Sequence, residues 1–294
     1  SVMDLMRHAM SVGTTPSVGH DFFEDMEARF VRINRSPIPT GIDKIDAKDI
    51  LNGGLGKGEI GVITAPTGVG KSHMLVNLGC AAIRNGFNVI HYTFELTETA
   101  TGLRYDSNLC QIPSNQVPER KEEVIEYYKE NGENLGKLMI KEYPTGTATV
   151  QTLRSHIEKL SLKGFIPQVL IIDYADIMRS SRQYDSMRHE LKKVYEDLRN
   201  LAMEKNLPIW TASQSNRDSA NSDIVGLENM AESYGKAQVA DVVISISRKP
   251  AEKAEGFGRL YIAKNRAGRD GIVFPVKLNT AMSRFSILEN SEEM

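Results

Sequence analysis

The stretch EIGVITAPTGVGKSHMLVNLGCAAI, residues 59–83, joins an apolar strand pattern to a helical pattern through a glycine-rich turn. The turn ends on the tripeptide GKS, residues 70–72, directly before the helical positions. A strand, a glycine-rich loop and a helix N-terminus together place backbone N–H groups where they can bind phosphate. The first position of the motif is Ala65 rather than glycine, so a flexible turn before an ordinary helix is the alternative. The pattern predicts a loop that binds a nucleoside triphosphate.

The composition is that of a globular protein with balanced charge. With 294 residues, of which 40% are hydrophobic, the chain is long enough to bury a large core. Its 36 basic and 38 acidic residues imply that contact with nucleic acid would need a local patch or an assembled channel. Two cysteines without metal-ligand spacing, Cys80 and Cys110, predict reduced packing residues in a cytosolic protein. The sequence lacks an apolar run long enough for a membrane span and lacks a signal-peptide pattern.

The first forty residues predict an appendage to the main domain. A linker rich in Gly, Thr, Ser and Pro precedes HDFFEDMEARFVRI, residues 20–33. This segment carries apolar side chains at helical spacing, namely Phe22, Phe23, Met26 and Phe30. Such a stripe is compatible with packing on its own domain and equally with docking on a neighbouring subunit. We predict a linker and helical arm over residues 1–40 and a main domain over residues 41–294.

From residue 59 onward, predicted strands and helices alternate. The predicted strands are 60–65, 88–94, 138–143, 168–174 and 207–212, and the predicted helices are 72–85, 98–110, 119–131, 150–163 and 184–206. Near-continuous apolar strands are typical of a parallel sheet that is buried on both faces. After residue 238, four short strands without helices between them predict an antiparallel extension at the sheet edge. The expected fold is therefore α/β, with a mostly parallel central sheet.

The segment VLIIDYADIM, residues 169–178, is an apolar strand that reaches an acidic residue, Asp173, at its end. A Walker B carboxylate occupies this place in nucleoside triphosphatases and helps to hold Mg²⁺. An aspartate after an apolar strand is often only a turn residue, but here it follows a predicted phosphate-binding loop. We predict that Asp173 and the hydroxyl of Ser72 hold the metal ion.

The position of the catalytic glutamate distinguishes classes of these enzymes. In one class it directly follows the Walker B aspartate, but here Tyr174 stands at that position. In the RecA-like class it ends the strand after the phosphate-loop helix, where VIHYTFELTE places Glu95. We predict that Glu95 is the general base that orients or deprotonates the attacking water. The alternative is that Glu95 only caps the helix that starts near Thr97.

Two further strand ends carry polar groups. PIWTASQSNR ends its strand at Gln214, the place of a γ-phosphate sensor in RecA-like motors. In YIAKNRAGRDG, Lys264 and Arg266 lie two residues apart at the end of a strand, so both side chains point the same way. Two such cations can act on one anion across a subunit boundary. A solvated basic turn is the alternative.

The motifs APTGVGKS, FELTE, LIIDY, WTASQSNR and AKNRAGRDG occur in the order found in DnaB-type hexameric replicative helicases, which this chain resembles. The segments GHDFFEDMEARF, IKEYPTGTATVQTLRS and DIVGLENMAES resemble helicases of T-even-like bacteriophages most closely. The resemblance covers nearly the whole chain from about His20, and the motifs are specific only together. Those helicases have an additional N-terminal helical domain, and the opening at Ser1 rather than Met leads us to expect a fragment.

The resemblance implies a RecA-like P-loop core and a role for each motif residue. It assigns nucleotide contacts to Thr67, Gly68, Val69, Gly70, Lys71, Ser72 and His73, magnesium ligation to Ser72 and Asp173, catalysis to Glu95, γ-phosphate sensing to Gln214, and action on a neighbour's nucleotide to Lys264 and Arg266. ATP and Mg²⁺ are the expected substrate and metal ion.

The resemblance also implies two loops that face a central DNA channel. The first loop carries Arg179, Arg182 and Arg188, and the second carries Glu232, Ser233, Gly235 and Lys236. Bacterial DnaB enzymes have an arginine where this chain has Ala231, so Lys236 is expected to supply that charge. Backbone N–H groups along such loops bind successive phosphates without reading bases, which predicts binding that is independent of sequence.

The expected protein is an ATP-dependent helicase that forms a homo-hexameric ring and moves 5′ to 3′ on single-stranded DNA at a replication fork. Primase and a helicase loader are expected partners, and the expected location is the cytoplasm, of the host cell if a bacteriophage encodes the chain. One alternative is a RecA-type filament for strand exchange, which imaging of rings or filaments distinguishes. Another is a loader or regulatory ATPase, whose hydrolysis would be indifferent to single-stranded DNA.

Overall fold

The computed structural model of the protein describes residues 21–24, 26–27, 35–216, 222–230 and 234–289. The chain divides into two compact units, of which the second begins at Ser36. Ile38 is buried in this second unit, where its backbone N–H donates to the carbonyl of Leu55 at 2.9 Å. The unit boundary therefore lies before Ser36 rather than after residue 40. Most of the predicted arm, including Phe30, lies outside the described residues.

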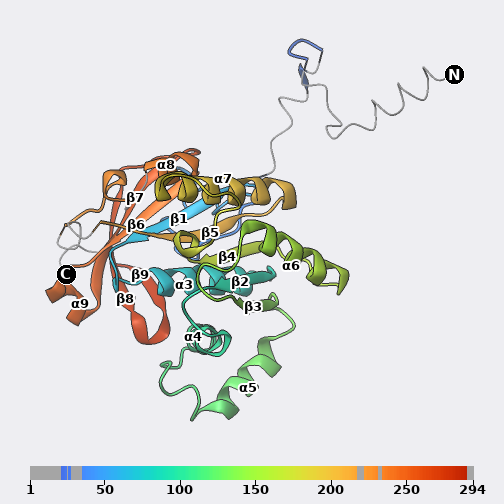
Figure 1. Ribbon diagram of the computed structural model, residues 1–294. Helices are drawn as coiled ribbons and strands as arrows, with labels where there is room; N and C mark the ends of the chain where they lie inside the picture. The colour runs from blue at the N-terminus through green and yellow to red at the C-terminus, as the bar shows by residue number, and fades with distance from the viewer. Residues whose placement is uncertain (1–20, 25, 28–34, 217–221, 231–233, 290–294) are drawn as a thin grey trace. The chain divides into compact units, whose positions relative to one another are not determined.

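One sheet forms the centre of the second unit (Figure 1). Its strands are β1 (Ile60–Ala65), β2 (Val89–Thr93), β3 (Leu138–Glu142), β4 (Val169–Asp173), β5 (Ile209–Gln214), β6 (Val242–Ser247), β7 (Phe257–Asn265), β8 (Val273–Asn279) and β9 (Arg284–Ile287). Within the described residues their order is β3-β2-β4-β5-β1-β6-β7-β8-β9. The first six strands in this order, from β3 through β1 to β6, are parallel. The remaining pairs, β6–β7, β7–β8 and β8–β9, are antiparallel. The mostly parallel sheet is confirmed, but β6 belongs to its parallel part and not to the extension.

The predicted helices form with similar boundaries. They are α3 (Lys71–Arg84), α4 (Glu98–Cys110), α5 (Lys121–Asn131), α6 (Val150–Leu162) and α7 (Met187–Lys205). The structure adds two short helices that were not predicted, α8 (Tyr234–Val239) and α9 (Pro250–Glu255), and the 3₁₀ turns η1 (Ala175–Ile177), η3 (Leu227–Asn229) and η4 (Thr280–Met282). The expectation of no helix between the last strands is wrong, because α9 separates β6 from β7. Pro250 starts α9, and Gly256, with φ of 81°, ends it. Among the described helices, none is both long and apolar enough to cross a membrane.

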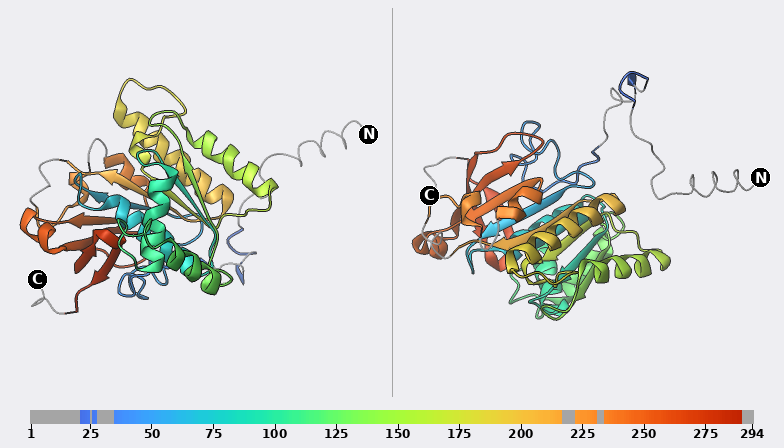
Figure 2. Two further views of the ribbon diagram at one scale, coloured as in Figure 1. Left: turned by 90° about the horizontal axis from the view of Figure 1, so that it is seen from below. Right: turned by 45° about the horizontal axis from the view of Figure 1, so that its top comes forward.

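Helices cover the two faces of the parallel strands (Figure 2), and a hydrophobic cluster fills the space on each face. Along β1, Ile63 and Ala65 face the cluster formed with α3, whereas Ile60 and Val62 face the cluster formed with α6 and α7. Successive side chains of a strand point to opposite faces, so every β1 side chain is buried. This burial explains the continuous apolar run in the sequence. Cys80 lies in the first cluster and is a free thiol.

The parallel strands bring four chain segments to the same edge of the sheet. Because β1, β2, β4 and β5 are parallel, their carboxyl ends and the loops that follow lie together. The register pairs Ala65 with Gln214 and Thr93 with Asp173. The phosphate-loop motif, the glutamate motif, the Walker B motif and the strand-end glutamine therefore meet at this edge.

Candidate active site

The glycine-rich loop between β1 and α3 has the backbone that its sequence requires. Gly68 and Gly70 have φ of 72° and 131°, a region that side chains other than glycine rarely adopt. A Cβ atom at Gly70 would also lie 2.8 Å from Cδ2 of Leu278. Helix α3 starts directly after the loop, without a side-chain N-cap and without an acidic residue in its first turn. Its first N–H groups are therefore left for an anionic ligand.

Lys71 places its ammonium group inside the loop. Its Nζ donates to the carbonyl of Ala65 at 3.1 Å and to that of Pro66 at 3.2 Å. Burial lowers the pKa of Lys71, while the carboxylates of Asp173 and Glu95 act in the opposite direction. The cation is thus held at the loop next to two acidic groups, where it can meet bound phosphates.

Asp173 lies beneath the loop at the end of β4 and is only 2% exposed. The hydroxyl of Ser72 donates to its Oδ1 at 3.2 Å, which joins α3 to β4. Burial raises the pKa of Asp173 to about 6, against the opposing hydrogen bond from Ser72. A hydroxyl and a carboxylate are hard oxygen donors, and Mg²⁺ commonly binds one or two protein oxygens together with substrate phosphates. The two residues therefore fit the predicted metal ion.

Replacing Asp173 with Asn is expected to stabilise the nucleotide-free and magnesium-free chain at neutral pH. The folded pKa of Asp173, about 6, lies above its ordinary value of 3.8. Ionisation of Asp173 therefore lowers the free energy of unfolding fully above pH 6 and has no effect below pH 3.8. The difference corresponds to at most about 3 kcal/mol of unfolding free energy. Urea unfolding should show an advantage of Asp173→Asn that fades as the pH falls through this window. An equal advantage at about pH 3 would contradict the assignment.

Glu95 follows β2 and faces the same cavity as Lys71 and Ser72. The helix α4 is capped by Thr97, whose Oγ1 accepts a hydrogen bond from the N–H of Ala100 at 3.1 Å. The alternative that Glu95 serves only as this cap is therefore not supported. Burial and the nearby Glu95 carboxylate together raise the pKa of Tyr174 to about 12.

Gln214, the last residue of β5, contacts the glycine-rich loop directly. Its Nε2 donates to Oγ1 of Thr67 at 2.7 Å. A side chain that reaches the phosphate loop from the neighbouring strand is in the place that sensing of a terminal phosphate requires.

A cavity of about 260 Å³ unites these groups. It is lined by Thr67, Gly68, Gly70, Lys71, Ser72, His73, Glu95, Arg104, Tyr174, Gln214 and Thr280. Of the predicted nucleotide residues, Val69 is buried and lies outside the lining. His73 lies 2.8 Å from Oγ of Ser283 through its Nδ1, and burial, with Arg104 and Arg248, lowers its pKa to about 4. His73 is therefore neutral at physiological pH.

The sequence matches the family described as "DnaB-like helicase C terminal domain" over residues 37–286. The chain belongs to this family. It is 30% identical over 256 residues to the DnaB-like replicative helicase of Enterobacteria phage T4, covering 84% of this chain and 54% of the relative. The replicative DNA helicase DnaB of Leifsonia xyli is 26% identical over 243 residues, covering 79% of this chain and 52% of the relative. The chain thus spans about half the length of these relatives.

Two solved structures share the fold of this DnaB-like chain. One, described as an ATPase domain, superimposes with a TM-score of 0.74 at 17% identity, covering 98% of this chain and 99% of the other. A DnaB-like replicative helicase, described with its interactions with primase, gives a TM-score of 0.76 at 18% identity, covering 98% of this chain and 71% of the other.

Arg104 is a cavity residue that the sequence motifs did not identify. It is the only basic residue of α4, and its Nη1 is buried without a hydrogen-bond partner in the described part of the chain. Burial lowers the pKa of Arg104, against the carboxylates of Asp173 and Glu95. A single arginine in the helix that follows the catalytic-base motif was the available signal.

Lys264 and Arg266 point the same way, as their spacing predicts, but they contact their own chain. Lys264 Nζ donates to the carbonyls of Ala237 and Ala240, both at 2.7 Å. Arg266 Nη2 donates to the carbonyl of Gln238 at 2.7 Å. Both cations therefore bind the C-terminal end of α8, where they complement its dipole. Their action on a neighbouring subunit stays a prediction and requires release of these contacts.

The residues predicted to contact DNA divide into three groups. Arg179, Arg182 and Arg188 are exposed, as a surface role requires. Glu232 and Ser233 lie outside the described residues, and Gly235 is partly buried near the start of α8. The prediction that Lys236 contacts DNA is wrong for this conformation, because the side chain is fully buried and its Nζ lies 2.9 Å from Oδ2 of Asp176.

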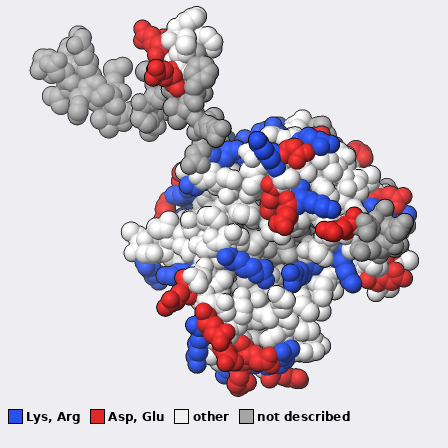
Figure 3. Space-filling model, turned by 180° about the vertical axis from the view of Figure 1, so that it is seen from behind, with Lys and Arg blue, Asp and Glu red and all other residues white. Residues whose placement is uncertain are grey.

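The surface charge of this DnaB-like chain is mixed. On the face shown in Figure 3, basic and acidic side chains are interspersed, and acidic groups gather at the lower end over α5. Neither sign dominates that face, which agrees with the balanced composition of the chain.

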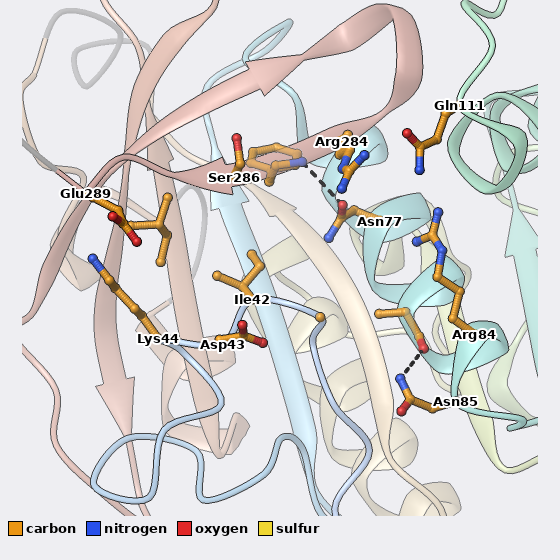
Figure 4. A pocket seen from close by; sticks show the side chains of 14 residues that line it. Ile42, Asp43, Lys44, Asn77, Arg84, Asn85, Gln111, Arg284, Ser286 and Glu289 are labelled. Atoms are coloured by element: carbon orange, nitrogen blue, oxygen red, sulfur yellow. Dashed lines mark hydrogen bonds between the residues drawn. The ribbon is translucent and has the colours of Figure 1, made fainter. Parts of the chain in front are cut away.

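A second cavity, of about 490 Å³, lies away from the phosphate loop (Figure 4). Residues 41–44, the second half of α3 and the strand β9 line it. Arg84 lies at this cavity and donates to the carbonyl of Asn108 at 2.6 Å. None of the predicted nucleotide residues lines this larger cavity, so we place the chemistry in the smaller one.

Proposed function

We propose that this chain is the ATP-hydrolysing motor of a replicative DNA helicase. As a homo-hexameric ring it moves 5′ to 3′ along single-stranded DNA and separates the strands at a fork. The observation that carries the proposal is the cavity that unites Lys71, Ser72, Glu95 and Gln214 above Asp173 in a DnaB-like chain.

The geometry supports a division of roles in hydrolysis. The N–H groups of the first turn of α3 and the ammonium group of Lys71 bind the β- and γ-phosphates. Glu95 accepts a proton from the attacking water, and Gln214 responds to the terminal phosphate through its contact with the loop. Ser72 and Asp173 would hold Mg²⁺, which neutralises charge on the phosphates when it is bound.

The assembly and its partners belong to the same proposal. Arg266 and Lys264 act on the nucleotide of the neighbouring subunit after leaving α8. In the arm before Ser36, Phe22 and Phe23 are 62% and 77% exposed, which suits docking on a neighbouring subunit. Primase is proposed as a partner because one structural neighbour is described with its primase, and a helicase loader is proposed from the family resemblance.

Single-stranded DNA is expected to stimulate ATP hydrolysis and to bind without sequence preference. Affinity should fall steeply with salt, because contacts from Lys and Arg to phosphates release counterions. Arg182→Ala is expected to lower the slope of log affinity against log salt by about one unit, if its exposed side chain contacts a phosphate.

The matched control is Arg120→Ala, which removes an arginine that pairs with Glu123 beside α5. Its slope should equal that of the wild type. Hydrolysis that is indifferent to single-stranded DNA would contradict the motor function. An unchanged slope in Arg182→Ala would show that Arg182 of the first loop does not contact a DNA phosphate.

A further inference from the structure

A buried polar cluster lies beside the nucleotide cavity. Its centre is the carboxylate of Asp176, in the turn η1 directly after the Walker B strand. This carboxylate accepts hydrogen bonds from the Tyr195 hydroxyl at 2.8 Å, the Ser213 hydroxyl at 3.0 Å, the Gln214 N–H at 3.1 Å and the Lys236 ammonium at 2.9 Å. Asp176 does not line the nucleotide cavity.

Lys236 is shielded from water, whereas Asp176 is mostly buried and lines a cavity of about 230 Å³ that Arg179 also lines. The side chain of Lys236 is 0% exposed and that of Asp176 is 11% exposed. Lys236 also donates to the Ser213 hydroxyl at 3.2 Å, so both charges are hydrogen-bonded beyond their contact with each other. A buried ion pair is weak evidence for stability, because desolvation offsets its attraction. We therefore consider that this ion pair fixes the relative position of the chain segments that carry its two residues.

The cluster joins the segments from which both predicted DNA loops start. Asp176 precedes Arg179 and Arg182 of the first loop, and Lys236, the last residue of the predicted second loop, lies in α8. Gln214 ends the strand before that second loop.

The same Gln214 connects the cluster to the nucleotide loop. Its side chain donates to Thr67 at 2.7 Å, while its backbone N–H donates to Asp176 at 3.1 Å. A shift of Gln214 that includes its backbone, when a phosphate binds or leaves, therefore strains or moves the contact to Asp176. Because Asp176 also binds Lys236, that movement reaches α8.

We infer that Asp176 and Lys236 are positioning residues that transmit the state of the nucleotide site from Gln214 to both DNA loops. This inference rests on the proposed motor function. The transmission runs through the ion pair itself, since Lys236 is buried, Asp176 is mostly buried, and each segment holds only one of the two charges. Neither residue needs to touch the nucleotide or the DNA.

The test compares hydrolysis without DNA and with saturating single-stranded DNA. Asp176→Asn and Lys236→Met each leave one buried charge unpaired and can fail to fold, so the decisive variant is the double substitution Asp176→Asn with Lys236→Met. This variant removes both charges and keeps similar side-chain volumes. Its hydrolysis without DNA is expected to stay within about twofold of the wild type, and its stimulation by DNA to fall by about tenfold or more.

Two controls separate coupling from structure. Lys192→Met with Glu196→Gln removes an exposed lysine–glutamate pair, 3.8 Å apart on α7, and should keep full stimulation. Lys236→Arg keeps the charge and should keep most of the stimulation. Full stimulation in the double variant of the cluster would overturn the inference, as would an equal loss of stimulation in Lys236→Arg.

The result also distinguishes the inference from the proposed function. Absence of DNA stimulation in the wild-type chain would refute the motor function itself. If basal and stimulated rates fall in proportion in the double variant, the cluster has only a structural role and the inferred coupling is wrong. A loss confined to stimulation would support it.

Discussion

Glu95→Gln is expected to bind ATP with nearly wild-type affinity and to hydrolyse it about a hundredfold to ten-thousandfold more slowly. An amide has nearly the same shape as a carboxylate, but it cannot accept the proton of the attacking water. The substitution should not disturb α4, because Thr97 and not Glu95 caps that helix. Fluorescent-nucleotide binding and single-turnover hydrolysis measure the two quantities separately.

Glu98→Gln is the matched control for this prediction. Glu98 lies three residues further along the chain, pairs with Lys141 at the surface and does not line the nucleotide cavity. Its hydrolysis rate should stay close to that of the wild type. If Glu95→Gln also hydrolyses ATP at the wild-type rate, the base is another group, and the role given to the end of β2 is wrong.

Arg266→Ala is expected to leave ATP binding largely intact and to lower DNA-stimulated hydrolysis by about a thousandfold or more. An arginine that stabilises charge on a neighbour's γ-phosphate contributes nothing to binding in its own site. In the single chain Arg266 binds Gln238 and lies 3.2 Å from Oδ1 of Asp241, so it must leave α8 to act. Arg269→Ala is the control, because Arg269 follows in the same turn but pairs with Asp49 at the surface.

Mixing Arg266→Ala with Lys71→Ala tests whether the arginine acts between subunits. The Lys71→Ala chain has lost its phosphate-binding ammonium group but keeps its arginine. In mixed rings, some interfaces then combine a working phosphate loop with a working arginine, and partial activity should return. Co-assembly is verified by native mass measurement. No recovery in rings that contain both chains would show that Arg266 acts in its own subunit or not at all.

Local sequence patterns were enough to establish the strand–helix alternation and the positions of the motif residues. Continuous apolar runs identified strands buried on both faces, and a parallel sheet necessarily brings the ends of such strands to one edge. For this reason, Lys71, Glu95, Asp173 and Gln214 could be assigned to one site before any distance was known. The glycine-rich loop could be recognised from the sequence because only glycine adopts its backbone angles without strain.

Which charged side chains are free to act depends on contacts that no local pattern contains. Lys236 has the sequence context of a DNA-contacting loop, but its burial depends on Asp176 and Ser213, which come from other segments of the chain. Likewise, the sequence singles out Arg104 as the one basic residue of α4 but does not show that α4 directs it into the cavity. Nothing local to Lys264 and Arg266 indicates their contacts with the carbonyls of α8. Periodicity and motifs describe neighbours along the chain, whereas the environment of a charge is set by contacts between segments that are distant in sequence.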